Sequence, residues 1–110
     1  MKQGELWMAD LNPVAGSEQK GIRPVLIISG NSMNDNLGIS IICPLTSKVK
    51  NYAGCLVLSP DDMNGLELQS EVISFQVRTI SHSRLTWKMG VITREQLEQV
   101  KKGLEEVLTY

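Results

Sequence analysis

Long hydrophobic runs are missing from this sequence of 110 residues. No apolar stretch approaches the ~20 residues that a membrane-spanning helix needs. The opening segment Met1–Glu5 also lacks the apolar core of a secretory signal. We therefore expect a soluble protein that stays in the compartment where it is made, the cytoplasm, and that has no membrane partner.

The residues that most often build metal and redox sites are few, because the chain has two cysteines and one histidine. Cys43 and Cys55 lie in apolar surroundings, without a CxxC spacing and without clustered histidines. This pattern favours buried, reduced thiols over a disulfide or a metal site, and it predicts no metal and no cofactor. His82 stands alone in a polar segment typical of an exposed turn, so one protomer cannot use a pair of histidines for acid–base chemistry.

Aromatic residues make up only 5% of the chain. They are scattered along it, so the sequence predicts no obvious strip of rings on which nucleic-acid bases could stack. Tyr52 does lie in a basic loop, and Trp7 is better explained as a core or interface residue. The five aromatic residues are Trp7, Tyr52, Phe75, Trp87 and Tyr110.

The net charge of −1 argues against a general nucleic-acid coat protein. Charge is nevertheless distributed unevenly. Residues 56–76 carry four acidic side chains and no basic one, whereas Lys20, Arg23, Lys48 and Lys50 lie in two other loops. Either these loops form a basic groove on an acidic body, or the charges are scattered and only keep the protein in solution.

The hydrophobic pattern predicts a mainly β protein with one confident helix, an α+β fold in a single domain of residues 1–110. A capping-box pattern at Thr93–Gln96 opens the helix, and apolar residues then recur on one face from Leu97 to Leu108. Short β-branched runs between turn residues predict strands, and residues 30–36 form a polar connection that can hold a helical turn. Together these elements suggest a small, strongly bent antiparallel sheet or barrel. The expected strands are 6–11, 23–29, 39–45, 55–58, 72–75 and 77–80.

The segment Gly16–Pro24 delivers Arg23 to the start of an apolar run. Pro24 favours extended geometry at Arg23, so the guanidinium is expected where a loop becomes a rigid strand. A second strand ends in Thr46-Ser47-Lys48. An arginine and a pair of hydroxyls at two strand ends are typical of a phosphate site.

These motifs resemble the MazF/PemK/Kid family of ribosome-independent endoribonuclease toxins. The resemblance begins at Gly4–Trp7 and is strongest over Gly16–Gln19, Arg23–Leu26 and Pro44–Lys48. It recurs at Gln76–Ile80 and covers nearly the whole chain in order. It implies an SH3-like barrel with added helices, a homodimer, and an antitoxin partner whose acidic, MazE-like tail occupies the RNA groove.

Cleavage of RNA by its own 2′-hydroxyl needs in-line alignment, proton transfer and stabilisation of extra negative charge, but in principle no metal. Arg23 is the first catalytic candidate, as a stabiliser of the charged transition state; a salt bridge to Glu18 or Asp35 is the structural alternative. Thr46 is the second, because its hydroxyl can donate to a phosphate oxygen or to the leaving group. Threonine is also common in strands, so the residues alone favour neither a structural nor a catalytic role. The family resemblance favours the catalytic one.

Further residues are candidates for contact with the substrate. In an extended strand Gln76 and Arg78 would share one face. Phe75 departs from the pattern of family members that carry an acidic residue before the glutamine, which puts base contacts at that position in doubt. Glu18 could orient Arg23, accept a proton or only favour the turn. The substrate-binding candidates are Ser17, Glu18, Gln19, Lys20, Ser47, Lys48, Gln76 and Arg78.

The sequence therefore predicts a sequence-specific, metal-independent endoribonuclease that cleaves single-stranded RNA, such as mRNA, as the toxin of a type II toxin–antitoxin pair. Single strands are the expected substrate because a duplex hides base edges and restrains the backbone. Two alternatives stay open at this point. One is a CcdB-like toxin that poisons a topoisomerase, and the other is a non-catalytic barrel that binds RNA or a peptide.

Overall fold

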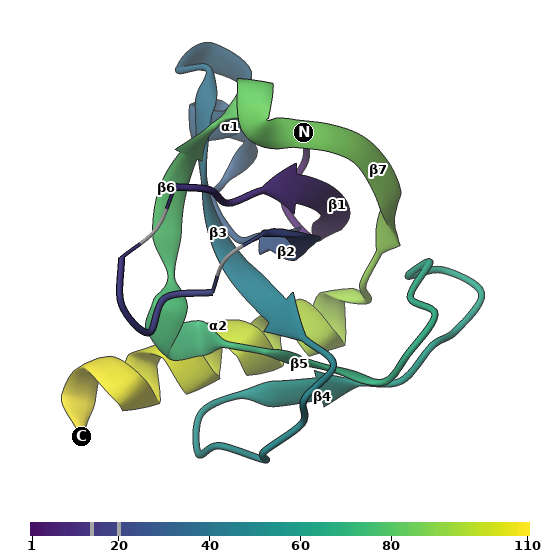
Figure 1. Cartoon of the computed structure of the whole chain (residues 1–110), viewed down its shortest axis with the longest axis vertical. Coiled ribbons are helices and arrows are strands. Elements are labelled where there is room, and N and C mark those ends of the chain that lie inside the picture. Colours follow the sequence, from purple (N-terminus) through teal and green to yellow (C-terminus); the bar gives the residue numbers. More distant parts are fainter. Residues whose placement is uncertain (14, 20) are drawn as a thin grey trace.

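The computed structural model describes residues 1–13, 15–19 and 21–110, and in this part of the chain seven strands form a strongly bent antiparallel sheet (Figure 1). The order across the sheet is β4-β5-β3-β2-β1-β7, and β6 pairs with β3 outside this path. The strands are β1 (Glu5–Asp10), β2 (Ile22–Ile27), β3 (Ile39–Thr46), β4 (Leu56–Leu58), β5 (Ser70–Val72), β6 (Arg78–Ser81) and β7 (Leu85–Val91).

Strand β3 organises the sheet because it pairs with three others. Strand β2 pairs with its middle, from Ile42 to Pro44, while β6 pairs with its first half and β5 with its last residues. Successive side chains of a strand point to opposite faces, and both faces of β2 and β3 are covered. This explains why their sequences are nearly continuous apolar runs instead of alternating ones.

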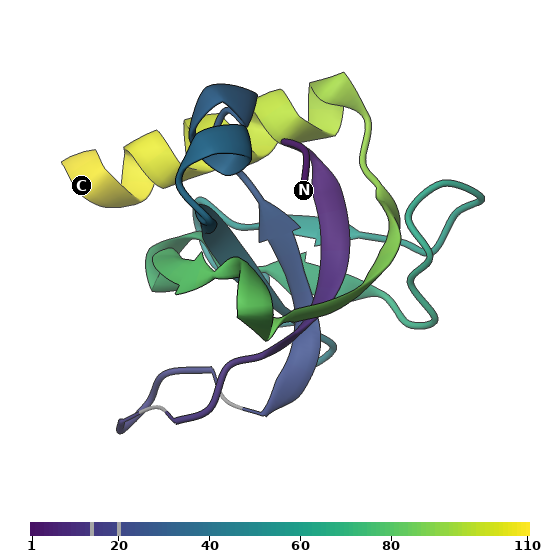
Figure 2. The ribbon, with the colours of Figure 1, turned by 90° about the horizontal axis from the view of Figure 1, so that it is seen from above.

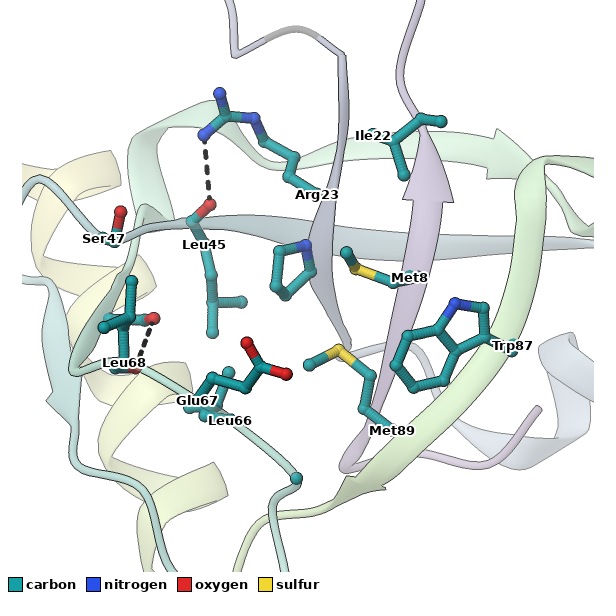
Figure 3. A pocket seen from close by; sticks show the side chains of 13 residues that line it. Met8, Ile22, Arg23, Leu45, Ser47, Leu66, Glu67, Leu68, Trp87 and Met89 are labelled. Carbon is teal, nitrogen blue, oxygen red and sulfur yellow. Dashed lines mark hydrogen bonds between the residues drawn. The ribbon is translucent and has the colours of Figure 1, made fainter.

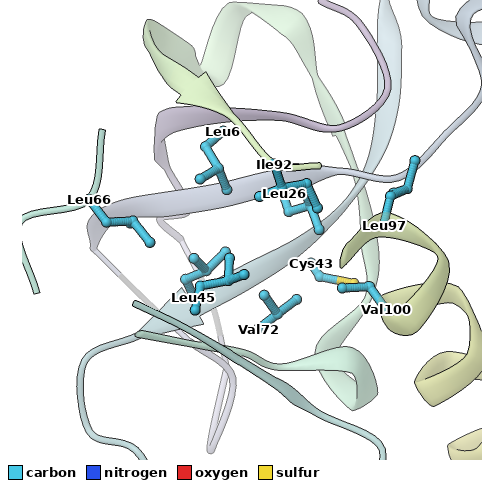
Figure 4. Packing of buried hydrophobic residues seen from close by; sticks show 10 residues of the cluster. Leu6, Leu26, Cys43, Leu45, Leu66, Val72, Ile92, Leu97 and Val100 are labelled. Atoms are coloured by element: carbon cyan, nitrogen blue, oxygen red, sulfur yellow. The ribbon is translucent and has the colours of Figure 1, made fainter. Parts of the chain in front are cut away.

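Two clusters of buried side chains result. On one face Leu26, Cys43 and Leu45 pack with Leu97 and Val100 of the terminal helix α2 (Arg94–Thr109) (Figure 4). On the other face Val25, Ile27 and Ile42 pack with residues of β1, β6 and β7. Burial, with a smaller contribution from the neighbouring Cys55, raises the pKa of the Cys43 thiol to about 12. Cys43 is buried as expected, whereas Cys55 is only half-buried.

The helices lie outside the sheet. Figure 2 shows α2 running across one side of the molecule, with α1 (Asn31–Asn36) above the sheet near the N-terminus. The capping box of α2 is present as predicted: the Thr93 hydroxyl accepts from the Gln96 N–H, and the Gln96 side chain accepts from the Thr93 N–H. No helix in the described part of the chain combines the length and the apolar character needed to cross a membrane.

Three details of the sequence-based prediction are wrong. Strand β7 was not predicted, because it pairs only with β1 and its mixed, largely exposed sequence shows no alternation. The expected strand 72–75 ends at Val72, and a 3-10 turn, η1 (Ser74–Gln76), follows it. His82 is half-buried in the turn η2 (His82–Arg84), where its Nε2 lies 2.7 Å from the Ser40 hydroxyl.

Candidate functional site

The end of β3 lies beside the beginning of β2. The two strands are antiparallel, and Val25 faces Pro44. Arg23 and Thr46 each lie two residues beyond this last pair, at the same end of the two strands. The sequence puts both residues at strand ends, and the pairing of the strands brings those ends together.

Arg23 is held partly by the backbone of β3. Its Nη1 donates to the Leu45 carbonyl oxygen over 3.5 Å. Figure 3 shows the guanidinium reaching over β3 and away from the apolar floor of a cavity of about 370 Å³. Ser47 and Glu67 also line this cavity, and its apolar side includes Trp87. Arg23 therefore sits at the rim, with its charge directed outward.

Thr46 is nearly buried, with 9% of its surface exposed. Its hydroxyl oxygen accepts a hydrogen bond from the Lys48 N–H at 3.2 Å. A hydroxyl that accepts one bond retains its own hydrogen for donation. Thr46 does not line the cavity of Arg23, although its chain neighbours Leu45 and Ser47 do. It lines another cavity of about 340 Å³.

Half of the predicted substrate-binding residues line the cavity of Thr46. They come from three segments that are distant in the sequence: the β1–β2 loop, the β3–β4 loop and η1. The predicted residues that line this cavity are Ser17, Gln19, Lys48 and Gln76, together with Thr46 itself.

Gln76 ties the β1–β2 loop to the rest of the site. Its Oε1 accepts from the Gln19 N–H at 2.6 Å, and its Nε2 donates to the Ser17 carbonyl oxygen at 3.3 Å. The expectation that Gln76 and Arg78 share one face of a strand is wrong, since Gln76 belongs to η1 and only Arg78 to β6. Both residues nevertheless line a third, smaller cavity with Glu18.

The remaining predicted residues support the loop or lie apart from it. The Glu18 carboxylate accepts from the Ala15 N–H at 2.9 Å, which closes a turn within the loop. Arg78 donates to the Leu11 carbonyl oxygen at 3.4 Å. Asp35, which the sequence offered as a partner for Arg23, forms a salt bridge with Lys2. Lys20 lies outside the residues that the structure describes.

Sequence analysis missed one residue of the site, Glu71. It was counted among the acidic residues of the surface, but its side chain is completely buried. Its carboxylate accepts three backbone N–H groups of the β3–β4 loop, from Lys50 at 2.7 Å, Asn51 at 3.2 Å and Tyr52 at 2.7 Å. Burial raises the pKa of the nearby Cys55 thiol, and the Glu71 charge adds to this rise. Its only sign in the sequence is that it directly precedes the apolar pair Val72-Ile73.

The arrangement combines a guanidinium at one hollow with a hydroxyl donor and exposed lysines at a second, both at the end of β3. Such groups can hold the phosphates of an extended nucleic-acid strand while the hollows receive its bases. Fold and site together therefore define a small, bent β protein whose candidate phosphodiester site lies at the ends of β2 and β3.

Comparison with known proteins gives the family. Residues 2–108 match the family model described as the PemK-like, MazF-like toxin of type II toxin–antitoxin systems. The endoribonuclease EndoA of Bacillus subtilis is 33% identical over 106 residues, which cover 96% of this chain and 91% of EndoA. The chain belongs to the PemK/MazF toxin family.

Solved structures agree with this assignment. The crystal structure of MazF from Deinococcus radiodurans superimposes with a TM-score of 0.86 at 27% identity, covering 100% of this chain and 97% of that one. A MazE–MazF structure from the same organism has a TM-score of 0.78 at 24% identity and covers 99% of this chain and 95% of the other, which shows the shared fold. The predicted bent β-barrel architecture with a C-terminal helix is thus confirmed.

Proposed function

We propose that this chain, as one functional domain of residues 1–110, cleaves single-stranded RNA such as mRNA in the cytoplasm, as the endoribonuclease toxin of a type II toxin–antitoxin pair. The observation that carries the proposal is that the pairing of β2 with β3 brings the start of β2, with Arg23, to the end of β3, with Thr46. Val25 pairs with Pro44, and Arg23 donates to the carbonyl oxygen of Leu45, the residue before Thr46. The family assignment supports the endoribonuclease function over a topoisomerase poison or a non-catalytic barrel.

The reaction is an attack of the RNA 2′-hydroxyl on the adjacent phosphorus. The new 2′-oxygen–phosphorus bond forms as the bond to the 5′-oxygen breaks, which leaves a cyclic phosphate and a 5′-hydroxyl. Arg23 stabilises the negative charge of the transition state, because its permanently charged fork can grip two phosphate oxygens. The Thr46 hydroxyl donates to a phosphate oxygen or to the departing 5′-oxygen.

Binding and selectivity come from the loops around this pair. Lys48 and Ser47 lie exposed next to Thr46 and can contact phosphates on either side of the cleaved bond. Ser17 and Gln19 line the same cavity as Thr46 and can read a base edge. A duplex would not fit such a site, because its bases are stacked and paired, so a single strand is the substrate.

Two protein partners belong to the proposal. Ile22, Leu68 and Trp87 are exposed around the cavity of Arg23, and burying this apolar rim against a second copy supports a homodimer. The second partner is a cognate antitoxin with an acidic, MazE-like tail. Its carboxylates would take the places of RNA phosphates near Arg23 and Lys48.

The direct test is incubation of the purified protein with mixed-sequence single-stranded RNA in excess EDTA. We expect discrete fragments that end in cyclic phosphate and begin with a 5′-hydroxyl, because Arg23 and Thr46 need no metal for this route. The fragment ends are identified by mass spectrometry, and the same RNA annealed to its complement is the control. Cleavage only after addition of a divalent metal, or cleavage of duplex as fast as single strand, would contradict the proposal.

A further inference from the structure

Two aromatic residues that are far apart in the sequence meet at the cavity of Thr46. The rings of Tyr52, from the β3–β4 loop, and Phe75, from η1, are 5.1 Å apart between centroids and nearly perpendicular, at 88°. Both line the cavity into which Thr46 projects. The sequence alone gave no sign of this pair, since 22 positions separate the two residues and aromatic residues are rare in the chain.

Both rings remain largely open to solvent. Tyr52 is 45% exposed and Phe75 is 49% exposed, although each is large and apolar over most of its surface. An edge-to-face pair is a preferred arrangement of rings, which restrains both of them. It leaves ring surface uncovered at the cavity, where a flat ligand can stack on it.

Hydrogen bonds to Glu71 hold the backbone of the loop that carries Tyr52. The buried carboxylate accepts the N–H groups of Lys50, Asn51 and Tyr52 itself. Glu71 belongs to β5 and faces Thr46 across the β3–β5 pairing. The Glu71 side chain therefore holds the Tyr52 backbone at a fixed position relative to β3, the strand that carries the Thr46 hydroxyl.

The chemistry around the rings matches one kind of ligand. Lys48 and Lys50 supply positive charge at the same cavity, and Gln19 and Gln76 supply amide groups. Cation-lined grooves with restrained aromatic rings are how proteins hold single-stranded nucleic acids, with bases stacked on rings and phosphates near the cations. A purely apolar ligand would leave the lysines and amides unused.

We propose that Tyr52 and Phe75 form a stacking site for one base of the RNA, next to the nucleotide whose phosphate lies at Thr46, and that Glu71 is the positioning residue of this site. The proposal rests on the proposed function and extends it from the cleaved bond to the neighbouring base. Stacking accepts any base, because every base has a flat face, so Phe75 and Tyr52 add affinity beside the cleavage point and hold the strand in place there.

The test uses the full-length protein and a single-stranded 2′-O-methyl RNA of mixed sequence, which cannot undergo attack by the 2′-hydroxyl. Phe75→Leu and Tyr52→Leu remove a ring but keep an apolar side chain. Each should weaken binding about tenfold, since stacking on one ring contributes about 1–3 kcal/mol per base. The Phe75→Tyr protein keeps a ring at this position and should bind the RNA with wild-type affinity. Tyr110→Leu is the matched control, because Tyr110 is fully exposed and does not line this cavity.

Two further readouts separate stacking from a loss of structure or of charge. The ratio of variant to wild-type dissociation constants should stay the same at low and raised salt, because a ring contributes no phosphate contact. RNA that contains 5-iodouridine should crosslink to Tyr52 or Phe75 under light. Glu71→Gln should reduce this crosslinking while the far-ultraviolet circular dichroism spectrum is unchanged.

The outcomes distinguish this proposal from the function on which it rests. Wild-type affinity in both leucine variants, or crosslinks confined to other residues, would overturn the stacking site even if unmodified RNA is cleaved. Crosslinks at Tyr52 or Phe75 with weakened leucine variants would support the site even if unmodified RNA stays intact, and that result would overturn only the endoribonuclease function.

Discussion

Thr46 can be tested by separating its hydroxyl from its shape. Thr46→Ser keeps the hydroxyl and should retain much of the cleavage rate. Thr46→Val has nearly the same size but cannot donate a hydrogen bond, so it should lose most of the rate. The measurement is the single-turnover cleavage rate of one RNA. Equal rates in the two variants would assign Thr46 to the packing of β3.

The site residues differ in how far the sequence could reveal them. Arg23 and Thr46 were predicted because a recognisable boundary marks each of them. Arg23 follows a glycine-bounded loop, and Thr46 follows the end of an apolar run. Glu71 was not, because a carboxylate that follows a glutamine and a serine is ordinarily exposed. Only the folded β3–β4 loop supplies the three N–H donors that compensate its burial. The contact of Tyr52 with Phe75 could not be predicted either, because the two residues are far apart in the sequence and meet only in the folded protein.

Helix α2 depends on a close approach of two glycines. Gly103 lies inside the helix, where glycine costs about 1 kcal/mol relative to alanine. A methyl group on Gly103 would lie 2.1 Å from the carbonyl oxygen of Gly54, in the β3–β4 loop. Gly54 itself has a φ of +79°, which favours glycine. Packing of the helix against this loop therefore requires the glycine that lowers its intrinsic helix propensity.

Gly103→Ala should consequently destabilise the protein despite its better helix propensity. We expect the free energy of unfolding to fall by about 1–3 kcal/mol, the usual cost of overpacking. Chemical denaturation followed by circular dichroism measures it. Lys102→Ala, at the exposed neighbouring position, is the control and should change stability by less than about 0.5 kcal/mol. A Gly103→Ala protein more stable than wild type would show that the loop moves aside without cost.

The elements themselves were predictable where a periodic pattern was strong. The capping box and apolar face gave α2, and the polar connection of residues 30–36 holds the short helix α1. Prediction failed where tertiary pairing overrides local pattern. Strand β7 forms because its backbone pairs with the edge of β1, and the register between the two strands shifts at two places. The segment 73–75 has strand-like residues but turns away from β5 after Val72.

Three of the basic groups line two cavities of the candidate site, although the net charge of the molecule is −1. Arg23 comes from β2, and Lys48 and Lys50 come from the β3–β4 loop, whereas the acidic Asp61 and Asp62 lie in the β4–β5 connection. Such a surface attracts a polyanion even when the protein as a whole is slightly acidic.

An acidic antitoxin tail should therefore inhibit cleavage competitively with RNA, and the inhibition should weaken as salt rises. The measurement is the inhibition constant of a synthetic tail peptide at several salt concentrations. A peptide with its carboxylates replaced by amides is the control and should inhibit poorly at every salt concentration. Inhibition that does not change with salt would rule out mimicry of phosphates by carboxylates.

The most direct measurement is the cleavage rate of the Arg23→Ala protein on single-stranded RNA in EDTA. We predict a rate at least ~10²-fold below wild type, as for other losses of a preorganised group that stabilises charge. Arg23→Lys should recover little of it, because lysine lacks the planar fork that grips two oxygens. Arg94→Ala, at the exposed start of α2, should cleave like wild type. A folded Arg23→Ala protein that cleaves RNA at the wild-type rate would contradict the assignment of this site.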